Sequence, residues 1–193
     1  MSDFLFYLGI GWEHIISPEA LDHLLFLAAL AAIYIFSDWK KVLILVTAFT
    51  IGHSLTLALS VLELVRLPDS WVEFLIPLTI ILTACFNLLT SSDSKNEIRF
   101  NYLIALLFGL IHGMGFANTI RFMLASDQQL WKGLLGFNVG LELGQILVVL
   151  VYLTIAEISM RMLRVRRRDW IIFISAGVFS LALKMSLERI PFL

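Results

Sequence analysis

The sequence predicts an all-α integral membrane protein: a bundle of about six transmembrane helices preceded by a short N-terminal helix. Of its 193 residues, 60% are apolar and only 15% are charged, and the mean hydropathy is +0.91. This composition is far from that of a soluble domain. Apolar stretches of about 20 residues, the length that crosses a hydrocarbon core of about 30 Å, recur along the chain. The composition therefore implies the lipid bilayer as a partner.

Charge and cysteine content exclude several other classes. The chain has 14 Lys plus Arg against 15 Asp plus Glu, a net charge of −1, so it has no basic excess for nucleic acid. Its one cysteine, Cys85, cannot form an intramolecular disulfide or a thiolate metal cluster.

A single membrane domain, residues 1–193, accommodates the predicted spans. Ser17-Pro18-Glu19 has the N-cap residue, the proline and the acidic residue that are typical of a helix start. The apolar segment 4–16 before it is too short to span, so we expect a helix that lies in the interface or re-enters the bundle. The expected spans cover approximately residues 21–37, 41–64, 71–91, 99–122, 131–160 and 169–188.

Basic residues predict the orientation of these spans, because Lys and Arg near span ends stay in the cytoplasm. The loops after the first, third and fifth spans hold nine of them, five of which lie between Arg161 and Arg168. The other connections and the ends hold five. We therefore expect a multi-pass protein with both the N- and the C-terminus outside. Five tryptophans near the predicted span ends, the depth that aromatic rings prefer, support the spans independently.

Ionisable residues inside the predicted spans point to function, since each costs at least about 2.5 kcal/mol to insert. All four histidines lie in or beside spans. Counting residues from the span ends places His53, His112 and Glu142 at one level near the midplane. By the same counting, His14, the Asp22-His23 pair and Glu73 lie above them on the outer side.

Helical spacing places further polar residues beside this group. Thr50 shares a face with His53, and Asn138 and Gln145 share one with Glu142. The pathway and supporting residues predicted in this way are Glu73, Asn138, Gln145, Thr50, Ser54 and Asn87.

Imidazole and carboxylate groups without thiolate suit a borderline divalent transition metal ion such as Ni, Co or Zn. The alternative for a single histidine is an interhelical hydrogen bond, and for Glu142 a protonated carboxyl group bonded to a neighbour. Four histidines grouped with acids on one side of a bundle favour the metal site.

Glycines at four-residue spacing predict close helix packing. Gly136, Gly140 and Gly144 form one such row, and Gly109 and Gly113 form another. We expect packing surfaces there, including a contact through which a homo-oligomer forms.

Four motifs in fixed order resemble the HupE/UreJ membrane proteins: DHLLF at 22–26, TAFTIGHSLTL at 47–57, FGLIHGMGFA at 108–117 and FNVGLELGQ at 137–145. The resemblance covers most of the chain from His14 to Gln145. It implies a nickel or cobalt permease with about six spans in the bacterial inner (plasma) membrane. The metal-handling residues that it implies are His14, Asp22, His23, His53, His112 and Glu142.

Two other functions are compatible with these residues. Three histidines with an open coordination position and an acid as general base describe an intramembrane zinc hydrolase, although the chain has no HExxH motif. A membrane accessory subunit or metal sensor would bind the ion without flux. The function that we expect is a transporter and not an enzyme. Membrane potential would drive it, because no nucleotide-binding motif is present.

Overall fold

The computed structural model describes residues 3–89, 97–117, 119 and 130–191, and these contain helices and no strand. The elements are α1 (Asp3–Ile16), η1 (Pro18–Ala20), α2 (Leu21–Ala32), η2 (Phe36–Asp38), α3 (Trp39–Val61), α4 (Asp69–Leu89), α5 (Glu97–Gly115), α7 (Leu130–Arg161) and α8 (Arg167–Glu188). The all-α prediction is therefore confirmed.

Four helices are long and apolar enough to cross a membrane: Phe36–Val61, Asp69–Leu89, Trp131–Arg161 and Arg167–Glu188. They correspond to the predicted spans 41–64, 71–91, 131–160 and 169–188. The protein is therefore a polytopic membrane protein.

The two other predicted spans differ from the expectation. The helix in the region 21–37 is α2, which has only 12 residues and extends about 18 Å, too short to cross alone. Helix α1 and the segment Pro18–Ala32 instead form a pair bent by 56°, which together has the length of one span. The apolar part of α5, Asn101–Gly115, is also shorter than a span, and residues 118 and 120–122 of the expected span lie outside the described part of the chain.

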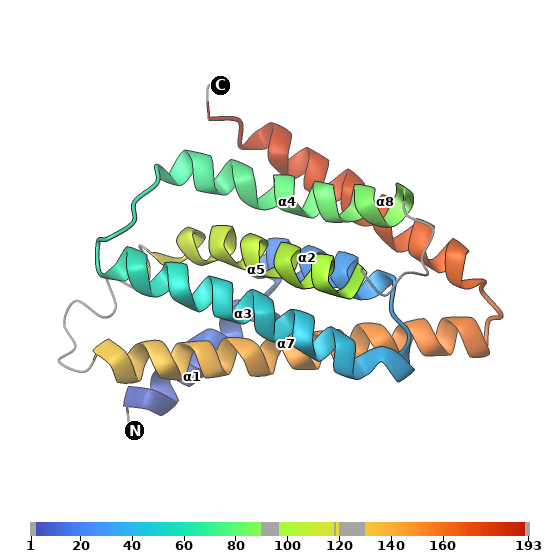
Figure 1. Cartoon of the computed structure of the whole chain (residues 1–193), viewed down its shortest axis with the longest axis horizontal. Helices are drawn as coiled ribbons and strands as arrows, with labels where there is room; N and C mark the ends of the chain where they lie inside the picture. The colour runs from blue at the N-terminus through green and yellow to red at the C-terminus, as the bar shows by residue number, and fades with distance from the viewer. Residues whose placement is uncertain (1–2, 90–96, 118, 120–129, 192–193) are drawn as a thin grey trace.

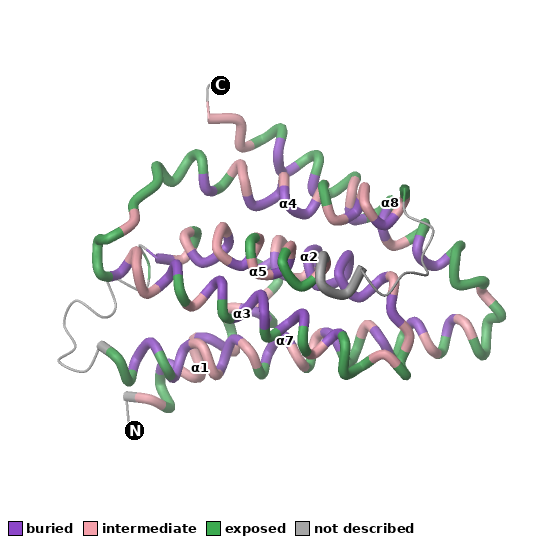
Figure 2. Tube along the Cα trace, in the orientation of Figure 1, coloured by how far each residue is buried: buried purple, intermediate pink, exposed green. Residues whose placement is uncertain are grey.

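The helices form three layers (Figure 1). Helices α4 and α8 pack along each other on one side, α2 and α5 lie in the middle, and α3 and α7 lie on the other side with α1 crossing α7. The two chain ends point to the same end of the bundle as the α3–α4 connection, and the α7–α8 connection lies at the opposite end. Buried residues face the shared interior of these layers (Figure 2).

Glycines let two helix pairs approach closely, as the spacing predicted. A Cβ added at Gly11, Gly136 or Gly140 would meet the backbone across the α1–α7 contact, and one added at Gly52 or Gly109 would meet it across the α3–α5 contact. These contacts are all within the chain. The glycine rows are therefore covered by α1 and α3 and are not available to a second copy, contrary to the expected oligomer contact.

Arginines at the end of the bundle with the α7–α8 connection bind carbonyls at helix ends. The Arg167 guanidinium donates to the carbonyl of Ile33 beyond α2 at 2.7 Å, and Arg168 donates to that of Leu88 in the last turn of α4 at 2.8 Å. A helix C-terminus leaves its last carbonyls without intrahelical partners, and a cation there also complements the helix dipole. The beginning of α8 thus holds the ends of α2 and α4 in place.

Candidate metal centre

Three histidines from three helices meet inside the bundle. His14 on α1, His23 on α2 and His53 on α3 each offer a ligand atom, and these atoms lie within 4.8 Å of one another. His112 on α5 completes the group, with its ring centroid 5.2 Å from that of His23. We call these four residues the histidine cluster.

The histidine cluster lies at one level, whereas residue counting placed His14 and His23 above His53 and His112. The bend between α1 and α2 explains the difference. Because α1 turns into the bundle and α2 starts there, the first turn of α2 lies beside the middle of α3, and His23 is only 4% exposed. The counting assumed that each helix begins at the membrane surface, an assumption that fails for a bent pair.

Asp22 orients the His23 ring. Its Oδ1 lies 3.0 Å from Nδ1 of His23 and also accepts a hydrogen bond from the His23 backbone N–H at 2.8 Å. A carboxylate can only accept, so it selects the tautomer with the proton on Nδ1. This leaves the lone pair of His23 on Nε2, where an ion can bind it.

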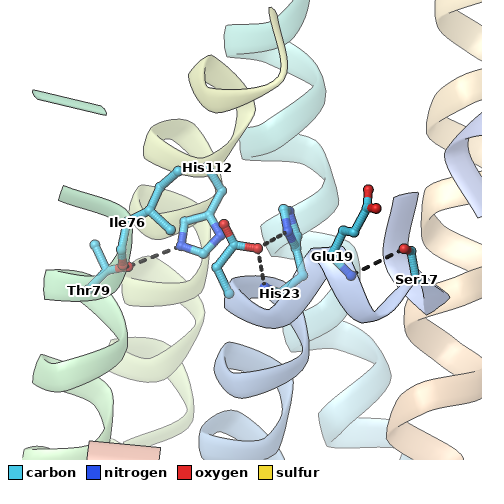
Figure 3. A network of polar contacts seen from close by, with 7 residues as sticks. Ser17, Glu19, His23, Ile76, Thr79 and His112 are labelled. Atoms are coloured by element: carbon cyan, nitrogen blue, oxygen red, sulfur yellow. Dashed lines mark hydrogen bonds and ion pairs between the residues drawn. The ribbon is translucent and has the colours of Figure 1, made fainter. Parts of the chain in front are cut away.

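Thr79 on α4 orients the His112 ring in a similar way (Figure 3). The Thr79 hydroxyl donates its proton to the carbonyl of Ile76 at 2.7 Å, and its oxygen lies 3.1 Å from Nε2 of His112. With its only proton already donated, the hydroxyl must accept from Nε2–H. The free lone pair of His112 is therefore on Nδ1.

Five buried imidazole nitrogens of the cluster have no hydrogen-bond partner among the described residues: His14 Nε2, His23 Nε2, both nitrogens of His53, and His112 Nδ1. Leaving a buried polar atom unpaired costs about 1–3 kcal/mol, so this is an expensive arrangement without a ligand. Bonds of about 2.1 Å to one ion would bring neighbouring nitrogens to roughly 3.0–3.4 Å, which requires a contraction of the cluster by ring rotation. The donor set fits a divalent transition metal ion.

A cavity of about 520 Å³ leads to the histidine cluster and carries negative charge. His14, His23 and His112 line it together with four acidic residues: Glu13, Glu19, Asp22 and Glu73. One basic residue, Arg189 after α8, also lines it. Carboxylates around a partly open mouth attract cations and raise their local concentration.

Aromatic rings pack against the histidine cluster. Phe116 lies 4.1 Å from the His14 ring, measured between centroids, and Phe49 lies 5.1 Å from His112. Phe137 stacks on His53 at 6.3 Å. Apolar rings therefore form part of the immediate surroundings of the imidazoles.

The other predicted residues are not members of the histidine cluster. The carboxylate of Glu142 is outside the group of close ligand atoms, and its Oε1 accepts a hydrogen bond from the Thr47 hydroxyl at 2.8 Å. Gln145 is fully buried and bonds to the Thr50 hydroxyl at 2.8 Å, one turn of α3 from His53.

The amide groups of the two predicted asparagines bind backbone. Asn138 donates to the carbonyl of Leu134 in its own helix, and Asn87 donates to that of Ala29 on α2. Ser54 is half-buried on α3 next to His53.

Sequence reasoning missed Thr79, Glu13 and Glu19. Thr79 precedes the predicted Asn87 by eight residues, close to two helical turns, so helical spacing would also have placed it on the face of Asn87. No sequence signal identified Glu13 and Glu19, because they line the cavity only through the bend between α1 and α2.

A comparison with protein-family models matches residues 1–189 to the HupE / UreJ protein model. None of the curated proteins and none of the solved structures matches the chain. The match covers nearly the whole chain and agrees with the four motifs. The chain therefore belongs to the HupE/UreJ family of membrane proteins.

Proposed function

We propose that the protein is a permease that carries Ni²⁺ or Co²⁺ across the bacterial inner membrane, with both chain termini outside and about six membrane crossings. The observation that supports it is the set of five unpartnered, buried imidazole nitrogens at the closed end of an acid-lined cavity. Hydrogen-bonded core histidines would not leave so many nitrogens free in the described part of the chain. The ion is the cargo of this site.

The carboxylates perform the first step. Glu13, Glu19 and Glu73 attract a hydrated cation into the cavity, where Asp22 adds a fourth negative charge next to His23. The ion then exchanges part of its water for imidazole nitrogen. His14, His23 and His53 are the ligands, and His112 adds its Nδ1.

The supporting residues hold the ligands in the correct tautomer. Asp22 keeps the Nε2 of His23 free, and Thr79 keeps the Nδ1 of His112 free. Ligand orientation of this kind typically changes metal affinity by about 10- to 100-fold. In this proposal Glu142 supplies a compensating charge. Thr50 and Gln145 are bonded to each other one turn of α3 from His53, Ser54 adjoins His53, and Asn138 adjoins Phe137 in the sequence.

Membrane potential drives the transport. A potential of 100 mV is worth about 2.3 kcal/mol per elementary charge, thus about 4.6 kcal/mol for a divalent ion. This free energy supports an accumulation of more than about a thousandfold. ATP is not required.

The test is metal flux into liposomes with an enclosed metal-sensitive dye and an imposed inside-negative potential. Ni²⁺ and Co²⁺ should enter, Zn²⁺ serves as the comparison, and His112→Ala should abolish entry. The control variant is Lys184→Gln, which replaces an exposed side chain outside the histidine cluster and should transport normally.

The same assay distinguishes the intramembrane hydrolase. Stoichiometric metal that copurifies with the protein and never enters the liposomes would contradict the permease. That result would favour an enzyme or a sensor with a resident ion.

A further inference from the structure

The bundle contains a second cavity that the ion site does not use. This cavity, which we call the inner cavity, has a volume of about 370 Å³ and lies between α2, α4 and α5. Its wall is mostly apolar, but four polar residues line it: Tyr34, Thr83, Asn87 and Asn101. The ends of α2 and α4 that Arg167 and Arg168 bind lie beside this cavity. It is therefore at the end of the bundle opposite the acid-lined cavity.

One layer of aromatic rings separates this inner cavity from the histidine cluster. Phe26 on α2 lines the inner cavity, and its ring centroid lies 5.4 Å from that of His112. Phe26 also stacks on Phe49 at 4.8 Å and meets Phe108 edge-on at 6.1 Å. The side chain of Phe26 is fully buried, so solvent does not reach it from either cavity.

Polar groups on α4 continue on both sides of this layer. Glu73 lines the acid-lined cavity, Thr79 holds His112, and Thr83 lines the inner cavity one turn further. The Thr83 hydroxyl donates to the carbonyl of Thr79 at 2.9 Å, and Asn87 follows after another turn. A cation that leaves the imidazoles thus finds oxygen donors along one helix face, interrupted only by the aromatic layer.

We infer that Phe26 is the gate of the ion pathway and that the inner cavity is an exit site for a divalent cation, with Thr83, Asn87 and Asn101 as its oxygen donors. The inference rests on the proposed transport function. Oxygen donors bind a borderline transition metal ion more weakly than imidazole does, so this site favours release. Rotation of one side chain, with no change in the ligands, joins the two cavities.

Cysteine accessibility tests the gate without any metal. The only native cysteine is removed by Cys85→Ser, and Thr83→Cys is introduced into the inner cavity. A membrane-impermeant thiol reagent is applied to sealed vesicles from either side, with Arg164→Cys and Leu64→Cys marking the two ends of the bundle. Thr83→Cys should react only from the Arg164 side. The addition of Phe26→Ala, or of the milder Phe26→Leu, should permit reaction from both sides.

The matched control is Phe86→Ala, which enlarges the same cavity from α4 but leaves the aromatic layer in place. One-sided labelling that persists in both Phe26 variants would overturn the gate, as would two-sided labelling in the Phe86 control or no labelling of Thr83→Cys from either side.

Flux provides a second readout. Phe26→Trp should slow ion entry about tenfold while metal affinity is unchanged, because only the barrier between the cavities is altered. Equal flux in wild type and Phe26→Trp would overturn the gate. If the wild-type protein shows no flux at all, the proposed permease fails, and the labelling experiment still decides whether Phe26 separates the cavities.

Discussion

The Thr79 hydroxyl lies 3.1 Å from Nε2 of His112 and donates its own proton to the carbonyl of Ile76, so one threonine determines which nitrogen of a buried histidine is free. The residue belongs to α4, which contributes none of the four histidines. Through it, the packing of α4 against α5 determines which nitrogen of His112 is available to an ion.

Replacement of Thr79 by valine therefore tests this relationship with almost no change in shape. Thr79→Val removes the acceptor for Nε2–H of His112, and metal affinity should fall about 10- to 100-fold. Thr79→Ser keeps the hydroxyl and should bind like the wild type. Titration of the purified protein with Ni²⁺ in competition with a chelating dye measures both variants. Equal affinity of the valine and serine variants would show that Thr79 has no role in metal binding.

Asp22 is expected to matter through its charge. Asp22→Asn retains an oxygen that accepts from Nδ1 of His23 but removes the negative charge beside the ion, so affinity should fall by at least about tenfold. Asp69→Asn, at the exposed start of α4, is the matched control and should leave affinity unchanged. The same dye competition measures the affinity of both variants. A loss of similar size in the control would mean that overall charge, and not the Asp22–His23 contact, governs binding.

The α1–α7 contact positions His14. A Cβ at Gly11 would meet the backbone of Phe137, whereas one at Gly9, on the same helix, would meet nothing within 4 Å. Gly11→Ala should therefore displace α1, lower the free energy of unfolding by about 1–3 kcal/mol and weaken metal binding. Gly9→Ala should fold and bind normally.

Thermal unfolding in detergent, read together with dye competition, distinguishes the two glycine variants. If Gly11→Ala lost stability but kept full affinity, His14 would not be a ligand.

Arg168 should contribute to stability by binding the end of α4. Arg168→Gln removes the charged donor from the Leu88 carbonyl, which should lower the free energy of unfolding by about 1 kcal/mol. Arg164→Gln, at the turn after α7, removes an equal charge without touching α4 and should change stability little. Thermal unfolding of both variants, in detergent without anionic lipid, makes the comparison. Equal effects would indicate that the arginines act only through their total charge.

The class of the protein follows from the sequence because the responsible properties are local. Hydropathy identified the four long spans, and the cost of placing ionisable groups in a bilayer singled out His14, His23, His53 and His112 as functional candidates. Glycine spacing correctly predicted close helix packing, since small residues permit it wherever the partner lies.

The sequence by itself thus determined an all-helical membrane protein with histidine and carboxylate chemistry, and the motifs indicated its family. The tertiary structure alone decided that the four histidines meet at one level, that Thr79 and the acids of the cavity support them, and that α1 covers the glycine row of α7. The physical reason is the 56° bend between α1 and α2. Helical periodicity gives the face and depth of a residue on a straight helix, but the bend and the helix contacts depend on packing between distant parts of the chain.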